Sequence, residues 1–187
     1  MLNIYSSIIR FSITLLLYAG ATNCFAYSSS PSSHTPKLDF FHVFSNNLPA
    51  ELAQASKAEQ FGVVLFFSTT HCPFCKRMKT TVFNQTSVQN YFKSKFRVFE
   101  IDIESPQHLI NEQRQDVTRI DFAKSHRVRL TPTLVFLNQQ GDVIYRHVGM
   151  IVDHQEFIWL GEYVVSGQTR KQNFAAFKMS KRRTQAP

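Results

Sequence analysis

Two cysteines separated by two residues, Cys72-Pro73-Phe74-Cys75, follow a continuous apolar run at Val63–Phe67 after a short loop. The run is β-branched and aromatic, which predicts a central strand buried on both faces. Pro73 suits the first turn of a helix, where a missing backbone N–H costs nothing. The sequence therefore predicts a strand, a short loop and a helix that begins at the cysteines.

The first 26 residues predict a secretory signal peptide. Arg10 precedes an apolar run, and Cys24 and Ala26 suit cleavage after residue 26. A retained membrane anchor and a lipoprotein at Cys24 are the alternatives, although the run is short for a membrane span. If the signal is removed, Cys72 and Cys75 are the two cysteines that remain of three.

This spacing indicates redox chemistry rather than a structural disulfide. A loop closed over two residues gains little chain entropy from a cross-link. Cys72, at the helix start, is the predicted attacking sulfur, because backbone N–H groups there stabilise a thiolate. Cys75, one turn later, is the predicted resolving sulfur. Zinc would need two further Cys or His ligands at suitable spacing, so no metal is predicted.

Charged neighbours are candidate modulators of the thiolate. His71 directly precedes Cys72, and Lys76 directly follows Cys75. The alternatives are a loop histidine without a role and a solvated helix face, because surface charges act weakly.

Four parts are predicted along the chain: a signal peptide at 1–26, a Ser- and Pro-rich lead at 27–48, a domain at 49–167 and a basic tail at 168–187. Residues 37–44 could form a short first strand or pack on the domain, and 104–116 are expected to be a polar inserted loop. Further expected elements are helices at 49–60, 86–92, 117–126 and from Asp153 to 165, strands at 96–103 and 133–137, and a hairpin partner at 143–147.

The formal net charge is +8, and much of it lies in the tail. The tail holds six cations and no acid, so the body of the chain is nearly neutral and no nucleic-acid-binding face is predicted. The tail is interpreted as a disordered, solubilising end. The alternative is weak contact with anionic lipid or an acidic partner, and Phe174 and Phe177 would permit docking on the domain.

Thr131-Pro132-Thr133 precedes the strand at 133–137, and Gly149 follows the hairpin. With the Cys-Pro-Phe-Cys segment, this order resembles the thioredoxin superfamily over about Pro49 to Gly167. The closest resemblance is to bacterial periplasmic thioredoxin-like proteins, including those associated with sulfur oxidation. This resemblance implies an α/β thioredoxin-like fold, with a central mixed β-sheet flanked by helices. It also implies that the protein is located in the periplasm.

The resemblance also implies a site. Pro132 is expected to be cis and to lie beside the reactive disulfide, with Thr131, Pro73 and Phe74 supporting the substrate. Exchange is expected to run through a mixed disulfide without a bound cofactor. The implied partners are disulfide-bearing exported proteins or small thiols, and an upstream membrane or soluble electron donor.

The chain departs from cytoplasmic thioredoxins at two points. It has Pro-Phe between the cysteines in place of Gly-Pro, and Phe66 where that family has a buried Asp. Glu100 on the neighbouring strand is the candidate proton acceptor, and an exposed strand carboxylate is the alternative. Thr131 before the proline is similar to what reducing or isomerising periplasmic members of the family carry, and this resemblance favours a reductase. The alternative hypotheses are a net oxidant or isomerase, and a thiol module that binds a metal or delivers a cofactor.

Overall fold

The structure is a computed structural model that describes residues 40–185. The predicted signal peptide, with Cys24, and most of the predicted lead lie outside these residues. The elements are α1 (Leu48–Lys57), β1 (Gly62–Ser68), α2 (Pro73–Thr81), α3 (Thr86–Lys95), β2 (Phe96–Asp102), β3 (His108–Ile110), β4 (Asp116–Thr118), α4 (Arg119–Ser125), β5 (Thr133–Asn138), β6 (Val143–Val148), α5 (His154–Val165), the 3₁₀ helix η1 (Gln168–Arg170) and α6 (Phe174–Gln185).

A four-stranded mixed sheet forms the centre, in the order β2-β1-β5-β6. β1 is parallel to β2 and antiparallel to β5, and β6 is antiparallel to β5. Every residue of β1 is buried, as the apolar run predicted. The α/β fold with a central mixed sheet is therefore confirmed.

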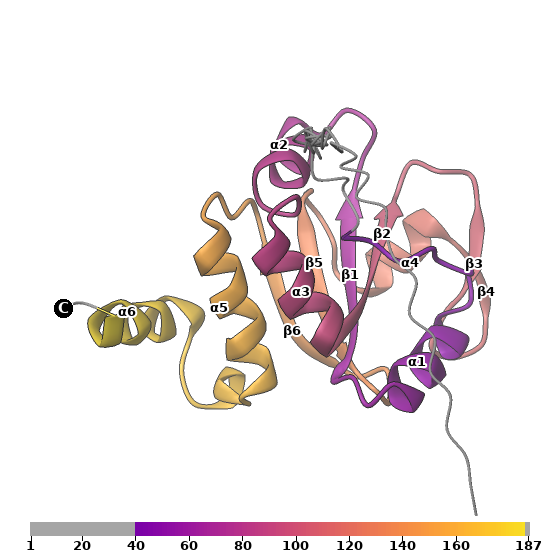
Figure 1. The fold of residues 1–187 in the computed structure, drawn as a ribbon. Helices are drawn as coiled ribbons and strands as arrows, with labels where there is room; N and C mark the ends of the chain where they lie inside the picture. Colours follow the sequence, from indigo (N-terminus) through magenta and orange to yellow (C-terminus); the bar gives the residue numbers. More distant parts are fainter. Residues whose placement is uncertain (1–39, 186–187) are drawn as a thin grey trace, which may run out of the picture. The chain divides into compact units, whose positions relative to one another are not determined.

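Helices cover both faces of this sheet (Figure 1). On one face, α2, α3 and α5 share a core with Phe66 and Phe136 of the sheet. Aromatic rings fill this layer: Phe92 of α3 stacks on Phe157 of α5 with ring centroids 4.3 Å apart. On the other face, α1 and α4 pack over Leu65. α2 follows the end of β1 and packs in one of these layers, so the packing of the layers on the sheet fixes the position of the cysteines.

One prediction about the connections is wrong. The expected loop at 104–116 contains β3, which pairs with β4 in a small antiparallel sheet. Its turn is closed by Asn111, whose Oδ1 accepts the Gln115 N–H at 2.8 Å. α4 begins only at Arg119, because Thr118 caps it through the Asp121 N–H. Within 40–44 the chain forms no strand and instead packs on the domain, the alternative: Phe40 is fully buried, and the His42 N–H donates to the Val98 carbonyl at 2.8 Å.

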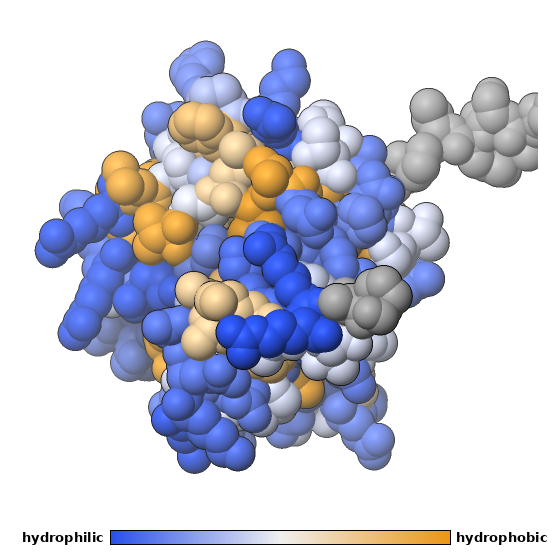
Figure 2. All heavy atoms as spheres, turned by 90° about the vertical axis from the view of Figure 1, so that its left-hand side faces the viewer, coloured by the Kyte–Doolittle hydropathy of each residue, from blue (hydrophilic) through white to orange (hydrophobic). Residues whose placement is uncertain are grey.

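The predicted disorder of the basic tail is also wrong, because residues 174–185 form α6. Phe174 and Phe177 are buried, with ring centroids 5.5 and 5.4 Å from that of Tyr163 on α5. Acids of α5 pair with its cations, as in Lys178–Glu156 at 3.0 Å. The face carrying α6 is mostly hydrophilic, with hydrophobic side chains gathered in its upper part (Figure 2). None of the described helices meets the length and hydrophobicity that a membrane span requires.

Candidate active site

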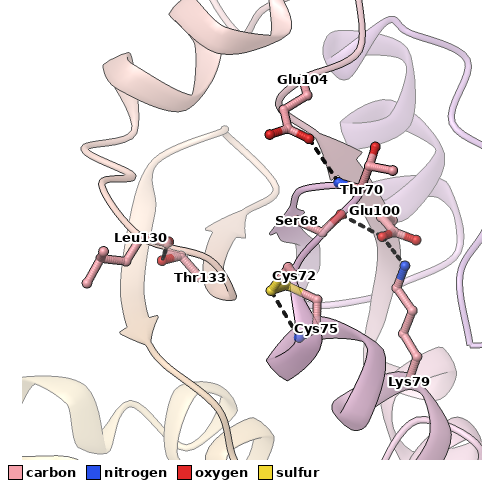
Figure 3. Close-up of a disulfide and its surroundings, with 9 residues drawn as sticks. All are labelled: Ser68, Thr70, Cys72, Cys75, Lys79, Glu100, Glu104, Leu130 and Thr133. Carbon is pink, nitrogen blue, oxygen red and sulfur yellow. Dashed lines mark hydrogen bonds and ion pairs between the residues drawn. A yellow bond between two sulfur atoms is a disulfide. The ribbon is translucent and has the colours of Figure 1, made fainter.

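The two cysteines form a disulfide at the N-terminus of α2 (Figure 3). Cys72 is the N-cap residue, and Pro73 occupies the first turn, where no N–H is missed. The Cys75 N–H donates to Cys72 Sγ at 3.1 Å. Cys72 is 8% exposed and Cys75 only 2%. Both sulfurs are thus held at the positive end of a helix, and Cys72 is the more accessible one.

A second loop carries the predicted proline. The Thr131–Pro132 peptide bond is cis. The Thr133 hydroxyl donates to the Leu130 carbonyl at 2.7 Å, and the Gly149 N–H donates to the Pro132 carbonyl at 2.9 Å. Gly149 has φ +99°, a conformation that glycine adopts without strain. The second of these bonds joins the residue after β6 to the residue before β5, beside the proline.

The start of α2 and the loop that carries the cis-proline share an apolar groove of about 300 Å³. Phe74 of α2 lines it together with Thr131 and Pro132, and residues 148–150 complete it with Leu130. The structure therefore brings Phe74, Thr131 and Pro132 together in one groove. Phe74 is 54% exposed and Leu130 is 68% exposed, so the groove presents apolar surface to the solvent.

Glu100 is bound on the other side of the disulfide (Figure 3). It lies opposite Phe66 in the β1–β2 register, and its Oε1 accepts the Ser68 hydroxyl at 2.6 Å. Lys79, one turn after Cys75 on α2, forms an ion pair with the same oxygen. Neither Ser68 nor Lys79 was identified from the sequence, because their partner depends on the register of β2 against β1.

The loop before Cys72 is bound by two further acids that the sequence reasoning missed. Glu104 Oε2 accepts the Thr70 N–H at 3.1 Å, and Asp102 Oδ2 accepts the Thr70 hydroxyl at 3.2 Å. Asp102 is the last residue of β2 and Glu104 follows shortly after it, at the edge of the sheet where β1 also ends. Acids at the end of a strand that neighbours β1 were the available signal.

The other predicted charges make no comparable contacts. His71 and Lys76 are exposed, and no hydrogen bond or ion pair joins either side chain to another residue within 40–185. In the same range, no cluster of three or more His, Cys, Asp or Glu residues is placed to hold a metal ion.

Comparisons with known protein families and solved structures identify the proteins that this chain is similar to. The family model for a thioredoxin-like domain matches residues 48–165. A thioredoxin-fold protein from Helicobacter pylori superposes with a TM-score of 0.63 at 17% identity, covering 79% of this chain and 96% of that one. A thioredoxin from Thermus thermophilus gives 0.51 at 26% identity, covering 66% and 88%. A DsbH oxidoreductase gives 0.51 at 20% identity, covering 63% and 81%.

A search of curated protein sequences finds no match. The family match spans more than half of the chain and includes both cysteines and Pro132. The chain therefore belongs to the thioredoxin-like family, as a thiol–disulfide oxidoreductase.

Proposed function

We propose that the protein is exported and reduces disulfides of exported proteins or small thiols through its Cys-Pro-Phe-Cys centre. The observation that carries this proposal is the position of Cys72. Cys72 is the more exposed residue of the pair, its sulfur accepts a helix N-terminal N–H, and it lies two residues before Phe74, which shares a groove with Pro132. The predicted signal peptide supports a periplasmic location, and the resemblance to sulfur-oxidation-associated thioredoxins supports that subtype.

The reaction is a two-electron exchange between two thiols and one disulfide. The Cys72 thiolate attacks one substrate sulfur and forms a mixed disulfide, and the other substrate sulfur leaves as a thiolate. The Cys75 thiol then loses its proton and attacks Cys72 Sγ, which releases the second substrate thiolate. The substrate gains two electrons, and the protein becomes the Cys72–Cys75 disulfide. An upstream dithiol donor must return the two electrons, and no bound cofactor takes part.

The Cys75 N–H supports the role of Cys72 as the nucleophile. A donor at 3.1 Å from Cys72 Sγ stabilises negative charge on that sulfur, as does the N-terminal end of α2. Pro73, the next residue, has no backbone N–H, and its absence does not weaken the helix because N–H groups of the first turn have no partner within the helix. Cys75 is almost fully buried, which suits a sulfur that acts only within the mixed disulfide.

The charges around the loop support the reducing direction. Glu104 and Asp102 bind Thr70, two residues before Cys72. Negative charge near a thiolate destabilises the reduced protein relative to its disulfide, which makes the protein a stronger reductant. The exposed Lys76 and Arg77 act in the opposite sense, and water screens them.

Glu100 is proposed as the proton acceptor for Cys75. It replaces the missing acid of β1 from the neighbouring strand, directly opposite Phe66. Lys79 ties it to the helix that carries Cys75. The apolar groove is proposed as the substrate platform, with Phe74, Thr131 and Pro132 contacting the segment that flanks the substrate disulfide.

A redox titration of the purified protein, combined with trapping in cells, tests the function. For a reductase, we expect a reduction potential well below that of the disulfides of exported proteins. We also expect the protein to reduce insulin. Cys75→Ser should accumulate mixed disulfides through Cys72, because the resolving thiol is gone.

The matched control is Cys72→Ser, which keeps one thiol but should trap nothing. A potential typical of strong oxidants would reverse the direction. A failure of the wild type to reduce insulin, together with an empty trap, would reject the enzyme proposal.

A further inference from the structure

A second groove, of about 490 Å³, lies on the other side of the loop that precedes Pro132. It shares Leu130 and Thr131 with the apolar groove beside Phe74, so the two grooves meet at these residues. Its floor includes Ile103, which follows β2, and Ile120 of α4. A polypeptide that passes over the cis-proline loop would therefore contact both grooves.

The two grooves differ in charge. The groove beside Phe74 has no charged side chain among its described lining residues. The second groove is lined by Lys124 and Arg129, and no acid of the described chain lines it. We propose that it binds carboxylate side chains on one flank of the substrate cysteine. This inference rests on the proposed disulfide exchange and adds a substrate class to it: cysteine segments that are apolar on one flank and acidic on the other.

Among the described residues, Arg129 is the lining cation of this groove that forms no ion pair. Asp121 pairs with Lys124 at 2.9 Å, three residues apart on α4. Glu104 and Asp102 bind Thr70, next to the lining residue Thr69, and keep their negative charge because Thr70 is a neutral partner, but neither acid lines the groove. Arg129 is exposed and forms no ion pair with another residue of the described chain. Its guanidinium can thus offer a bidentate contact to a substrate carboxylate.

The apolar floor makes this contact more than a diffuse attraction. Leu130 is 68% exposed and Ile120 is 42% exposed, and both lie beside the cations in the groove. A substrate segment that covers them removes water from around Arg129, and a charge pair gains strength as its surroundings lose water. The result is a preference that depends on the position of the acid, rather than on the net charge of the substrate alone.

The test uses disulfide-linked homodimers of a short peptide with one central cysteine. Glu, Gln or Lys is placed two residues before the cysteine in one series and two residues after it in another. The pre-reduced protein is mixed with each dimer at low salt, and the second-order rate of peptide thiol release is measured. In one series, the Glu dimer should react about three- to tenfold faster than the Lys dimer. The other series should show no such ratio, because the opposite groove carries no charge.

Two variants separate the groove from the general field of the protein. Arg129→Glu should invert the ratio in the selective series. Arg127→Glu makes the same charge change two residues earlier, at an exposed position that lines neither groove, and should preserve the ratio. About 0.5 M salt should weaken the preference, because screening then acts within about 4–5 Å.

The outcomes also distinguish this inference from the proposed function. If even the Gln dimers are not reduced, the disulfide exchange itself is wrong. If the Gln dimers are reduced but charge has no effect, only the groove is wrongly assigned. Equal preferences in both series, or an equal response to Arg127→Glu and Arg129→Glu, would also overturn the groove, since a diffuse positive field explains them.

Discussion

Lys79 of α2 forms an ion pair with Glu100 of β2, one helical turn beyond Cys75. The pair, together with the Ser68 hydroxyl on the same carboxylate, joins the cysteine helix to the edge of the sheet. It can serve as a proton acceptor site or as a purely structural tie. Two substitutions distinguish these roles, because each breaks the ion pair and only one removes the acid.

We expect Glu100→Gln to slow the resolving step about tenfold near neutral pH and to change its pH profile, because the acceptor for the Cys75 proton is lost. Lys79→Gln keeps the carboxylate and should retain most of the rate. The measurement is peptide release from a preformed mixed disulfide on Cys72, followed from about pH 5 to 9. Equal losses in the two variants, or an unchanged profile in Glu100→Gln, would leave the pair a structural tie.

The carboxylate that binds the Thr70 N–H should influence the redox equilibrium. Glu104→Gln removes the negative charge that binds the Thr70 N–H, two residues before Cys72, and should raise the reduction potential of the protein by about 10–20 mV. The matched control is Glu59→Gln, an exposed carboxylate just after α1, which should leave the potential unchanged. Equilibration with glutathione measures both. A lower potential in Glu104→Gln would contradict the argument that this acid favours reduction of substrates.

Phe74 should contribute to substrate binding rather than to sulfur chemistry. Phe74→Ala removes apolar surface from the groove beside Pro132 and should raise KM for apolar peptide disulfides about three- to tenfold. Reaction with a small disulfide such as oxidised dithiothreitol should be unaffected. Met179→Ala is the control, because Met179 is also 54% exposed but lies on α6. A similar loss with the small disulfide would point to damage at the cysteines instead.

Phe177 should anchor α6 to α5. Phe177→Ala leaves a cavity against Tyr163 and should lower the free energy of unfolding by about 2–4 kcal/mol. Met179→Ala, on the exposed side of the same helix, should change it by less than about 0.5 kcal/mol. Urea denaturation of the disulfide form measures both. A negligible effect of Phe177→Ala would mean that α6 packs too weakly in solution to contribute to stability.

His147 should make stability depend on pH. Burial, reinforced by Lys178, lowers the pKa of His147 below its ordinary value of 6.5. The unfolded chain therefore takes up this proton first, so the contribution to stability is present above about pH 6.5 and is lost as the pH falls below it. We expect His147→Gln to flatten the fall in unfolding free energy between about pH 7 and 5, by at most about 1.4 kcal/mol per pH unit.

The matched control for this pH effect is His154→Gln, at an exposed position at the start of α5. It should leave the pH dependence of the unfolding free energy as it is in the wild type. Burial also lowers the pKa of His42, so part of the dependence should survive in His147→Gln. A pH dependence in His147→Gln identical to that of the wild type would contradict the assignment.

The sequence by itself determined the elements whose signals are local. The apolar run at Val63–Phe67 had to be buried on both faces, and it forms the central strand β1. Pro73 and the cysteine spacing placed the start of α2, and Asp153 capped α5 through the Glu156 N–H as predicted. These features depend on a few neighbouring residues, whose backbone preferences and hydrogen bonds hold in almost any surrounding fold.

Tertiary structure decided what depends on distant partners. From the sequence alone, six cations without an acid indicate a disordered tail. In the structure, Glu156 and Glu162 of α5 form ion pairs with cations of the tail, and the ring of Tyr163 packs against α6. The pairing of Lys79 with Glu100 requires the exact register of β2 on β1, and the two grooves exist only because segments far apart in the sequence meet at Leu130 and Thr131. Burial and charge compensation are properties of the surroundings, and a linear sequence does not state which residues supply them.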